Sequence, residues 1–293
     1  MARTSARGLL KEVRPHQWTK NALVFAAPIA AGVITEGEVA LRTTGAFVAF
    51  CLAAGGTYLL NDARDVEADR RHPTKCRRPI AAGEVAVTDA YVVGAILLVA
   101  AIALGWYIAG ALAAVIAAYL VLTTCYSFWL KHIAVVDLVA VASGFVLRAA
   151  AGAAAVDIPF SEWFFVVTSA GALMMITGKR EGELAEAGNG GETRPVLTQY
   201  TASYLASIRM VAAGLALIAY CLWAFDPTIA AVGSSELFLR ISVAPFTVAI
   251  LRYALLIDQG RGAEPERLLF EDRVLLVAGA LWAMIYGYGI YLA

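Results

Sequence analysis

Asn61-Asp62-Ala63-Arg64-Asp65-Val66-Glu67-Ala68-Asp69 is the stretch that decides how the rest of this chain is interpreted. It follows an apolar run, residues 44–60, that is long enough to cross a bilayer. At about 100° per residue, an α-helix would bring Asp62, Asp65 and Asp69 within roughly 60° of one another on one face. Three carboxylates on one face repel each other unless a cation lies between them, and such oxygen ligands favour Mg²⁺ or Ca²⁺. The stretch therefore predicts a cation site at a helix end.

Basic residues follow the acidic stretch at once. They are Arg70, Arg71, Lys75, Arg77 and Arg78. Bound Mg²⁺ usually keeps water and substrate phosphates among its ligands, and lysine and arginine pair with phosphate. Carboxylates for a metal beside cations for phosphate indicate a diphosphate site. The alternative is a solvated acidic loop with no ligand.

The composition predicts an all-α polytopic membrane protein. Hydrophobic residues make up 60% of the chain and charged residues 16%, and the mean hydropathy is +0.71. Nine apolar stretches are long enough to be transmembrane helices or nearly so. They are residues 21–34, 42–61, 88–107, 109–129, 133–152, 162–178, 203–224, 237–257 and 271–292. The first lacks a small-residue cleavage site, so we expect no cleavable signal peptide.

The distribution of lysine and arginine predicts the orientation in the membrane. With the N-terminus inside, the cytoplasmic segments contain nearly all the basic residues, and the opposite side keeps Arg42 and Arg240. The positive-inside rule then places the N-terminus and the acidic stretch in the cytoplasm and the C-terminus outside. We expect a multi-pass protein of the plasma membrane, with the lipid bilayer as its surroundings and no nucleic-acid partner. The sequence is compatible with a homo-oligomer but does not fix the oligomeric state.

A second charged stretch, Gly178-Lys179-Arg180-Glu181-Gly182-Glu183-Leu184, lies at another predicted cytoplasmic helix end. Lys179 and Glu183 are four residues apart, so a surface ion pair is the simpler interpretation of those two residues. The two charged helix ends predict one membrane domain, residues 1–293, in which a basic segment, 1–20, precedes two loosely repeated halves, about 21–132 and 133–293.

Several single residues have two interpretations on sequence alone. Lys20 either binds a ligand or extends to the membrane surface, and Tyr126 and Lys131 resemble interfacial anchors. Asp137 and Arg148 lie within an apolar stretch, where charged residues are commonly functional. Arg148 is also close enough to the predicted outer end to reach the interface, so its role is left open.

The first motif resembles that of a known family. Asn61-Asp62-x-x-Asp65-x-x-x-Asp69, followed by Lys75-x-x-Arg78-Pro79-Ile80-x-x-Gly83, is similar to the first aspartate-rich motif of the UbiA superfamily of intramembrane prenyltransferases. The resemblance implies a nine-helix bundle in which two charged motifs bind a Mg²⁺-diphosphate above a membrane tunnel for an isoprenoid. It extends along essentially the whole chain.

The second motif departs from that superfamily, whose members commonly have another aspartate-rich D-x-x-x-D element. The departure resembles the decaprenyl-phosphate phosphoribosyltransferase branch. Further matches to that branch are Arg14-Pro15-x-Gln17-Trp18-x-Lys20-Asn21, Gly178-Lys179-Arg180-x-x-Glu183-Leu184 and Tyr200-Thr201-x-x-Tyr204-Leu205. The branch implies that the isoprenoid is the acceptor, a polyprenyl (decaprenyl) phosphate, and that 5-phosphoribosyl diphosphate (PRPP) is the donor. The product would serve arabinan synthesis for the cell wall.

The resemblance also implies roles for individual residues. Asp62, Asp65 and Asp69 would hold Mg²⁺ and serve catalysis, with Asp69 acting through water. The implied substrate-binding residues are Lys20, Asn61, Lys75, Arg78, Tyr126, Lys131, Lys179, Arg180, Glu183 and Tyr200. PRPP carries a 5-phosphate that prenyl diphosphates lack, so additional cations at the second motif fit an additional phosphate.

Two other functions remain as alternatives. A prenyltransferase of the common type would use Asp62 and Asp65 to move a polyprenyl group from its diphosphate to an aromatic or other small acceptor. A transporter would use the charged helix ends as ion sites. The charges gather at one membrane surface rather than at the bilayer midplane, which argues against transport.

Overall fold

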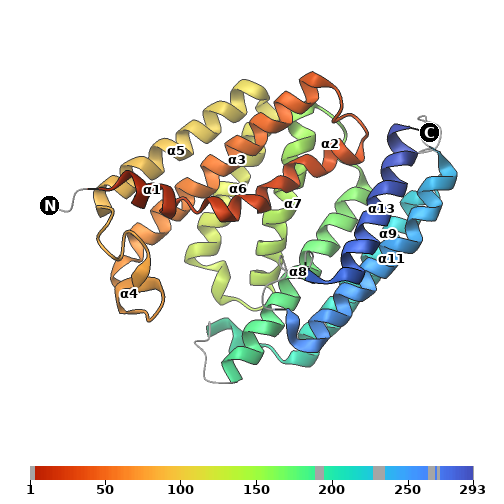
Figure 1. Cartoon of the computed structure of the whole chain (residues 1–293). Coiled ribbons are helices and arrows are strands. Elements are labelled where there is room, and N and C mark those ends of the chain that lie inside the picture. Colours follow the sequence, from red (N-terminus) through yellow and green to blue (C-terminus); the bar gives the residue numbers. More distant parts are fainter. Residues whose placement is uncertain (1–3, 189–194, 227–234, 263–267, 269–270, 293) are drawn as a thin grey trace. The chain divides into compact units, whose positions relative to one another are not determined.

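The computed structural model describes residues 4–188, 195–226, 235–262, 268 and 271–292 (Figure 1). All the regular elements within these ranges are helices, which agrees with the predicted all-α class. The long α-helices are α3 (Gly37–Arg64), α5 (Val87–Ile108), α6 (Gly110–Phe128), α7 (Val136–Val156), α8 (Glu162–Gly188), α9 (Ala202–Ala224), α11 (Glu236–Leu256) and α13 (Arg273–Tyr291). The short elements are α1 (Ala6–Glu12), η1 (Pro15–Phe25), α2 (Ala26–Ala30), α4 (Val66–Arg71), η2 (Lys75–Arg77), η3 (Leu130–His132), η4 (Pro195–Gln199) and η5 (Ile257–Arg261).

The chain divides into two compact units. Unit 1 comprises residues 1–29, 33–127 and 147–159, and unit 2 comprises residues 30–32, 128–146 and 160–293. Helix α7 contributes its first half to unit 2 and its second half to unit 1. Each unit contains one of the two charged stretches.

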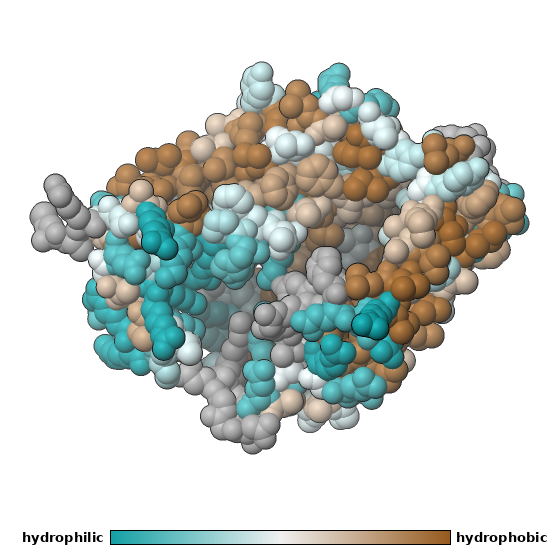
Figure 2. All heavy atoms as spheres, in the orientation of Figure 1, coloured by the Kyte–Doolittle hydropathy of each residue, from teal (hydrophilic) through white to brown (hydrophobic). Residues whose placement is uncertain are grey.

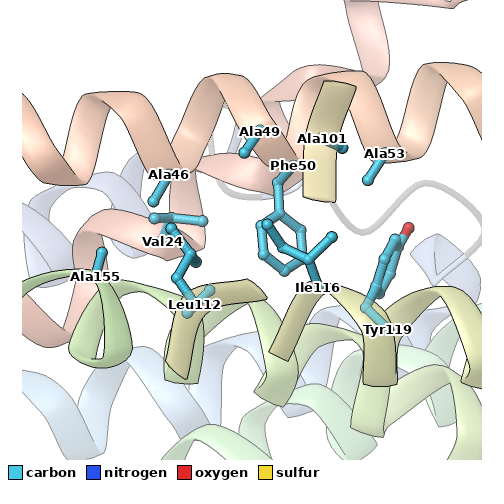
Figure 3. Close-up of a cluster of buried hydrophobic side chains, with 11 residues drawn as sticks. Val24, Ala46, Ala49, Phe50, Ala53, Ala101, Leu112, Ile116, Tyr119 and Ala155 are labelled. Atoms are coloured by element: carbon cyan, nitrogen blue, oxygen red, sulfur yellow. The ribbon is translucent and has the colours of Figure 1, made fainter. Parts of the chain in front are cut away.

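Unit 1 is built around the pair α3 and α5. These two helices approach closely because Gly56 and Gly94 face each other. A Cβ atom added at Gly56 would lie 2.9 Å from the Gly94 carbonyl oxygen, and one added at Gly94 would lie 3.3 Å from the Gly56 carbonyl oxygen. Phe50 and Tyr119 fill the core beside this pair, with ring centroids 5.2 Å apart (Figure 3). The close approach fixes both helices that flank the acidic stretch.

Unit 2 is held together by contacts of α9 with α8 and of α11 with α13. Its core includes Met174 of α8, Ala212 and Ala213 of α9 and Leu256 of α11, all buried. A second cluster around Leu138, Leu197 and Leu205 packs the start of α7 against η4 and α9. These contacts fix the charged end of α8.

Seven of the described helices are long and apolar enough to cross a membrane: α3, α5, α6, α7, α9, α11 extended through η5, and α13. The surface over α3 and α5 is largely hydrophobic, whereas hydrophilic residues gather around α4 (Figure 2). The chain is therefore a multi-pass membrane protein.

Two of the nine expected spans differ from the prediction. The first, 21–34, is not one helix: η1 ends at Phe25, α2 runs from Ala26 to Ala30, and a turn follows. Pro28 and Gly32 explain the interruption, because proline removes a backbone donor and Gly32 adopts a positive φ of 76°. Helix α8 covers the expected span 162–178 but is not among the seven, because the charged second stretch lies within the same helix and its apolar part is short.

Candidate active site

The acidic stretch does not form one continuous helix. Helix α3 ends at Arg64, Asp65 is its C-cap, and α4 begins at Val66. The Asp65 amide still donates to the Asn61 carbonyl at 2.9 Å, but Asp65 has φ −90° and ψ 9°, outside the helical range. The prediction that Asp62, Asp65 and Asp69 share one uninterrupted helix face is therefore wrong. Asp62 therefore lies on α3 and Asp69 on α4, with Asp65 at the junction between the two helices.

Asp62 and Asp69 are brought together by arginine. Arg78 Nη1 donates to Asp62 Oδ1 at 3.0 Å and to Asp69 Oδ2 at 2.6 Å. Arg14 also donates to Asp62, and its guanidinium lies over the Tyr58 ring, 4.8 Å from the centroid. Both aspartates are buried, which strengthens these charge-assisted contacts. The geometry thus joins the acidic motif to the arginine of the following basic segment.

Arg14 reaches Asp62 from an unusual backbone conformation. Its φ of 53° lies in the left-handed region, which is uncommon for a residue other than glycine. Pro15 follows at the first position of η1, where its fixed φ suits a helix start. Arg14 begins the Arg14-Pro15-x-Gln17-Trp18 motif, but the sequence did not indicate that it contacts Asp62. The signal was its place before the proline, since prolines favour turns that redirect the chain.

Glu12 is a further carboxyl in this cluster, and sequence reasoning missed it. It is 1% exposed, and its Oε2 accepts the backbone N–H of Ile80 at 3.2 Å. Its Oε1 lies 4.0 Å from Arg14 Nη2, beyond hydrogen-bond distance. Burial, together with the neighbouring Asp62 carboxyl, raises the pKa of Glu12 to about 8. Glu12 is therefore largely protonated at neutral pH.

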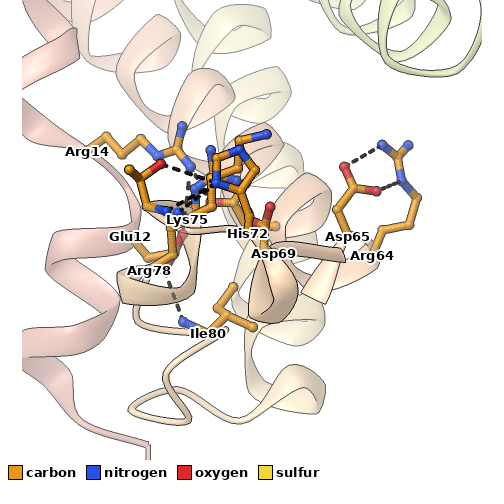
Figure 4. Close-up of polar contacts among 11 residues, drawn as sticks. Glu12, Arg14, Arg64, Asp65, Asp69, His72, Lys75, Arg78 and Ile80 are labelled. Carbon is orange, nitrogen blue, oxygen red and sulfur yellow. Dashed lines mark hydrogen bonds and ion pairs between the residues drawn. The ribbon is translucent and has the colours of Figure 1, made fainter. Parts of the chain in front are cut away.

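Asp65 lies to one side of this cluster. Its carboxylate accepts two hydrogen bonds from Arg64, from Nε at 2.8 Å and from Nη2 at 3.1 Å (Figure 4). Its side chain is 44% exposed, whereas Asp62 is buried. In the part of the chain that the structure describes, no three His, Cys, Asp or Glu side chains are grouped as a metal-ligand set. Asp65 would have to turn toward Asp62 to complete one.

Arg148, whose role the sequence left open, is buried in the interior of unit 1. Its Nε donates to Asn21 Oδ1 at 2.8 Å and its Nη2 to the Tyr119 hydroxyl at 2.9 Å. The guanidinium also lies over the Tyr119 ring at 4.7 Å. Asn21 in turn donates to Cys51 Sγ at 3.4 Å. Arg148 thus anchors η1, the segment that carries Lys20, to α6 and α7.

In unit 2, the second charged stretch forms a buried network with Asp137. Arg180 Nε donates to Asp137 Oδ2 at 3.0 Å, and Arg180 Nη1 donates to Glu183 Oε2 at 2.7 Å. The Tyr200 hydroxyl donates to Asp137 Oδ1. Burial and the hydrogen bond to Asp137 raise the pKa of Tyr200. The network accounts for three of the predicted site residues, Arg180, Glu183 and Tyr200.

A second arginine fixes the neighbouring turn of α8. Arg209 of α9 is buried, and its Nε donates to Glu181 Oε1 at 3.0 Å. Its Nη2 donates to Asp258 Oδ1 at 3.2 Å, at the start of η5. Burial raises the pKa of Glu181, and the Arg209 guanidinium opposes that shift. The charged stretch of α8 is therefore held by ion pairs at Arg180 and at the adjacent Glu181.

The other predicted site residues differ in exposure. Lys75 is exposed, and its backbone N–H donates to His72 Nδ1 at 3.3 Å. The remaining five are half-buried: Lys20, Asn61, Tyr126, Lys131 and Lys179. In unit 1 the structure joins Asp62, Asp69 and Arg78. In unit 2 it joins Arg180, Glu183 and Tyr200.

Apolar helices with an acidic cluster in one unit and a mixed-charge cluster in the other are what an intramembrane enzyme of the prenyltransferase class would present. The chain belongs to the UbiA prenyltransferase family, whose model matches residues 22–277. The family prediction is thereby confirmed, and so is the prediction that the chain is a transferase enzyme.

Named relatives place the chain more closely within the family. It is 46% identical to the decaprenyl-phosphate phosphoribosyltransferase of Mycolicibacterium smegmatis, over 97% of this chain and 92% of that one. It is 44% identical to the protein of the same name from Mycobacterium tuberculosis, over 96% of this chain and 93% of that one.

The fold also matches that of a solved structure. A UbiA homolog from Archaeoglobus fulgidus, bound to DMAPP and Mg²⁺, superposes with a TM-score of 0.70 at 16% identity, over 96% of this chain and 98% of that one. At this identity the likeness concerns the fold.

Proposed function

We propose that this protein transfers the 5-phosphoribosyl group from PRPP to a polyprenyl phosphate, decaprenyl phosphate, and releases diphosphate. The product, decaprenylphosphoryl-5-phosphoribose, would feed arabinan synthesis for the cell wall. The observation that carries the proposal is 46% identity, along nearly the whole of both chains, to a relative that bears this activity in its name. The second charged stretch supports it, because Lys179 adds a cation there and two phosphorylated substrates need more cations than one prenyl diphosphate.

The donor set of the acidic cluster fits Mg²⁺. Asp62 and Asp69 present buried carboxylate oxygens at one place, and Asp65, half-buried, lies at the junction of α3 and α4 between them in the sequence. Hard oxygen ligands of this kind suit Mg²⁺, and a solved relative of the same fold binds it. Asp62, Asp65 and Asp69 would hold the ion. When bound, the ion neutralises negative charge on the leaving diphosphate.

The arginines of unit 1 would exchange partners when substrate binds. Arg78 and Arg14 are paired with Asp62 in the structure, and both side chains are partly exposed. Arg14 and Arg78 would then donate to the diphosphate oxygens in place of Asp62, and such charge-assisted hydrogen bonds are strong. Lys75, exposed on the same segment, would add a further cation. These residues bind and orient the donor.

The attacking group needs little activation. The lipid phosphate is already an anion, so no strong general base is required, and orientation of the two substrates contributes most of the rate. Lys179, half-buried at the end of α8, is the residue of the second stretch best placed by exposure to contact a phosphate. Lys20, Asn61, Tyr126 and Lys131 complete the proposed binding set.

We place the active site on the cytoplasmic side of the plasma membrane, with the N-terminus inside and the C-terminus outside. The lysine and arginine asymmetry supports this orientation. It also agrees with the chemistry, because a soluble phosphorylated sugar donor is a substrate of the cytoplasm and the polyprenyl chain stays in the bilayer.

The test uses purified protein in detergent with PRPP labelled in the ribose, decaprenyl phosphate and Mg²⁺. Label should enter the organic phase with the parent protein and should stay in the aqueous phase with Asp62→Asn, which removes a carboxylate of the proposed metal set. A Glu67→Gln variant, altered at an exposed carboxylate of the next helix, should behave like the parent.

A second arm tests the prenyltransferase alternative, which the family description favours. The same protein is given a labelled prenyl diphosphate and small aromatic acceptors. Transfer of the prenyl group, with no ribose entering the lipid phase, would replace the proposed reaction with common prenyl transfer.

A further inference from the structure

Arg180 has a surprising place for a residue expected to bind phosphate. Its side chain is 2% exposed, and two carboxylates accept from its guanidinium: buried Asp137 at 3.0 Å and half-buried Glu183 at 2.7 Å. A guanidinium that donates from Nε to one carboxylate and from Nη1 to another is held in both position and rotation. Its hydrogen bonds would have to break before it could contact a phosphate at the surface.

Asp137 is fully buried, and both of its oxygens are engaged. Oδ2 accepts from Arg180, and Oδ1 accepts from the Tyr200 hydroxyl. The Tyr200 hydroxyl also accepts the backbone N–H of Val135 at 2.6 Å. Three separate elements, the start of α7, the end of α8 and the residue after η4, therefore meet at one carboxylate. A satisfied polar network of this kind specifies one arrangement of the elements that it joins.

The turn before α7 is strained where this network holds it. Val135 has φ 68°, and a β-branched residue in the left-handed region is a genuine outlier. Such conformations persist where the surrounding contacts impose them, and they gather at functional sites. Here the contact is the Tyr200 hydroxyl, which ties the strained N–H to the Asp137 carboxylate.

We propose that Asp137, Arg180 and Tyr200 are positioning residues that fix the carboxylate of Glu183, and with it the end of α8 that carries Lys179, for phosphoribosyl transfer. Arg180 acts through Glu183 rather than by contact with a phosphate. Asp137 supplies the buried charge that keeps the guanidinium in place. This inference rests on the proposed function, since it assigns how the second charged stretch is held in that reaction.

A double-mutant cycle tests the connection. Asp137→Asn keeps the shape of the side chain and removes its charge, and Glu183→Gln does the same at the other end of Arg180. Each single variant should lower kcat/KM by at least tenfold. The kcat/KM of the double variant should lie within about threefold of that of the more impaired single variant, because both changes break one connected unit. Multiplicative effects of the two changes would overturn the proposal.

Two further variants separate positioning from direct binding. Tyr200→Phe removes only the hydroxyl that donates to Asp137 and should lower kcat/KM in the same direction, with KM for PRPP changing less than kcat. Arg180→Lys keeps a charge that could bind phosphate but cannot span both carboxylates, so it should remain impaired. If both Arg180→Lys and Asp137→Asn kept the kcat/KM of the parent, Arg180 would be a direct ligand and the proposal would fail.

Asp272→Asn is the matched control. Asp272 is also a buried carboxylate of unit 2 in a two-contact pair with an arginine, Arg252, at 3.1 and 2.8 Å. It caps α13 by accepting the backbone N–H of Leu275, so its described hydrogen bonds join it to Arg252 and Leu275 and not to Arg180. This control should lose thermal stability with kcat and KM unchanged.

Amide hydrogen exchange tests the positioning role independently of which reaction the protein catalyses. Amides of residues 178–184 should exchange at least tenfold faster in Asp137→Asn than in the parent, and at the parental rate in Asp272→Asn. A parent protein that fails to transfer ribose would refute the proposed function alone, and unchanged exchange in Asp137→Asn would refute the positioning role.

Discussion

Glu12→Gln should stabilise the protein at alkaline pH and leave it unchanged in acid. Glu12 is buried beside Asp62, and its pKa is raised from 4.5 to about 8. Below pH 4.5 the carboxyl is protonated in both the folded and the unfolded protein, so its ionisation does not affect stability. Between pH 4.5 and 8 the unfolded chain loses the proton and the folded protein keeps it, so stability falls as the pH rises. Above about pH 8 both are charged and the loss is complete.

The size of the effect follows from the same pKa values. At about 1.4 kcal/mol per pH unit, the rise from 4.5 to about 8 sets an upper bound of roughly 5 kcal/mol. We expect about 2–3 kcal/mol at pH 8, because Arg14, partly exposed beside Glu12, can move closer once the carboxylate is charged. The glutamine amide is neutral at every pH and still presents an oxygen to the Ile80 N–H.

The assay is unfolding by sodium dodecyl sulfate in mixed micelles, followed by circular dichroism between pH 4.5 and 8.5 in the presence of a chelator. The free energy of unfolding of Glu12→Gln should exceed that of the parent by a margin that grows with pH. Glu67→Gln, altered at an exposed carboxylate, should run parallel to the parent. Parallel curves for Glu12→Gln and the parent would refute the raised pKa and the buried position of Glu12.

Three further predictions concern other parts of the chain. Arg78→Gln should destabilise the protein by about 1–3 kcal/mol in the presence of a chelator, because Asp62 and Asp69 lose their shared partner. Millimolar Mg²⁺ should raise the melting temperature of this variant more than that of the parent. An equal response to Mg²⁺ would contradict the proposed metal set. Arg148→Gln should lower the free energy of unfolding by about 2–4 kcal/mol, since two buried charge-assisted hydrogen bonds are lost. A double-mutant cycle with Tyr119→Phe should show coupling between the two residues. Additive effects on the free energy of unfolding would count against the Tyr119 contact. The orientation can be tested in intact cells with a variant that keeps Cys76, lacks the other cysteines and carries Glu162→Cys at an exposed position. A membrane-impermeant thiol reagent should label residue 162 and leave Cys76 unmodified. The reverse pattern would invert the proposed orientation.

The sequence predicted those features that depend on composition and on local spacing. Long apolar runs predicted most of the membrane helices, because a helix that crosses a bilayer must be apolar along its length. The acidic stretch and the basic residues that follow it predicted one diphosphate site, and the structure brings Asp62, Asp69 and Arg78 of these two segments into contact. The family prediction followed from the same motifs.

The features that the sequence did not predict depend on breaks and on long-range contacts. The helix break at Asp65 depends on the backbone angles of one residue, and the spacing of the aspartates, which suits a continuous helix, does not indicate it. Glu12 joins the cluster because α1 brings it to the Ile80 amide, 68 positions away. Asp137 and Arg180 are separated by 43 positions, and their ion pair requires α7 and α8 to be placed first. No periodicity within one helix could indicate these contacts.

The close approach of Gly56 and Gly94 has a consequence for the segment between them. The two helices hold both ends of the connection from Asp65 to Ala86, so this segment is a closed polymer loop anchored on one helix pair. The entropy of closing such a loop grows only with the logarithm of its length, so two or three residues added at its exposed tip near Pro73 would change the stability by roughly 0.1 kcal/mol. Chain entropy therefore leaves the length of this loop almost unrestricted. Its length is restricted instead by the need for Arg78 to return to Asp62 and Asp69.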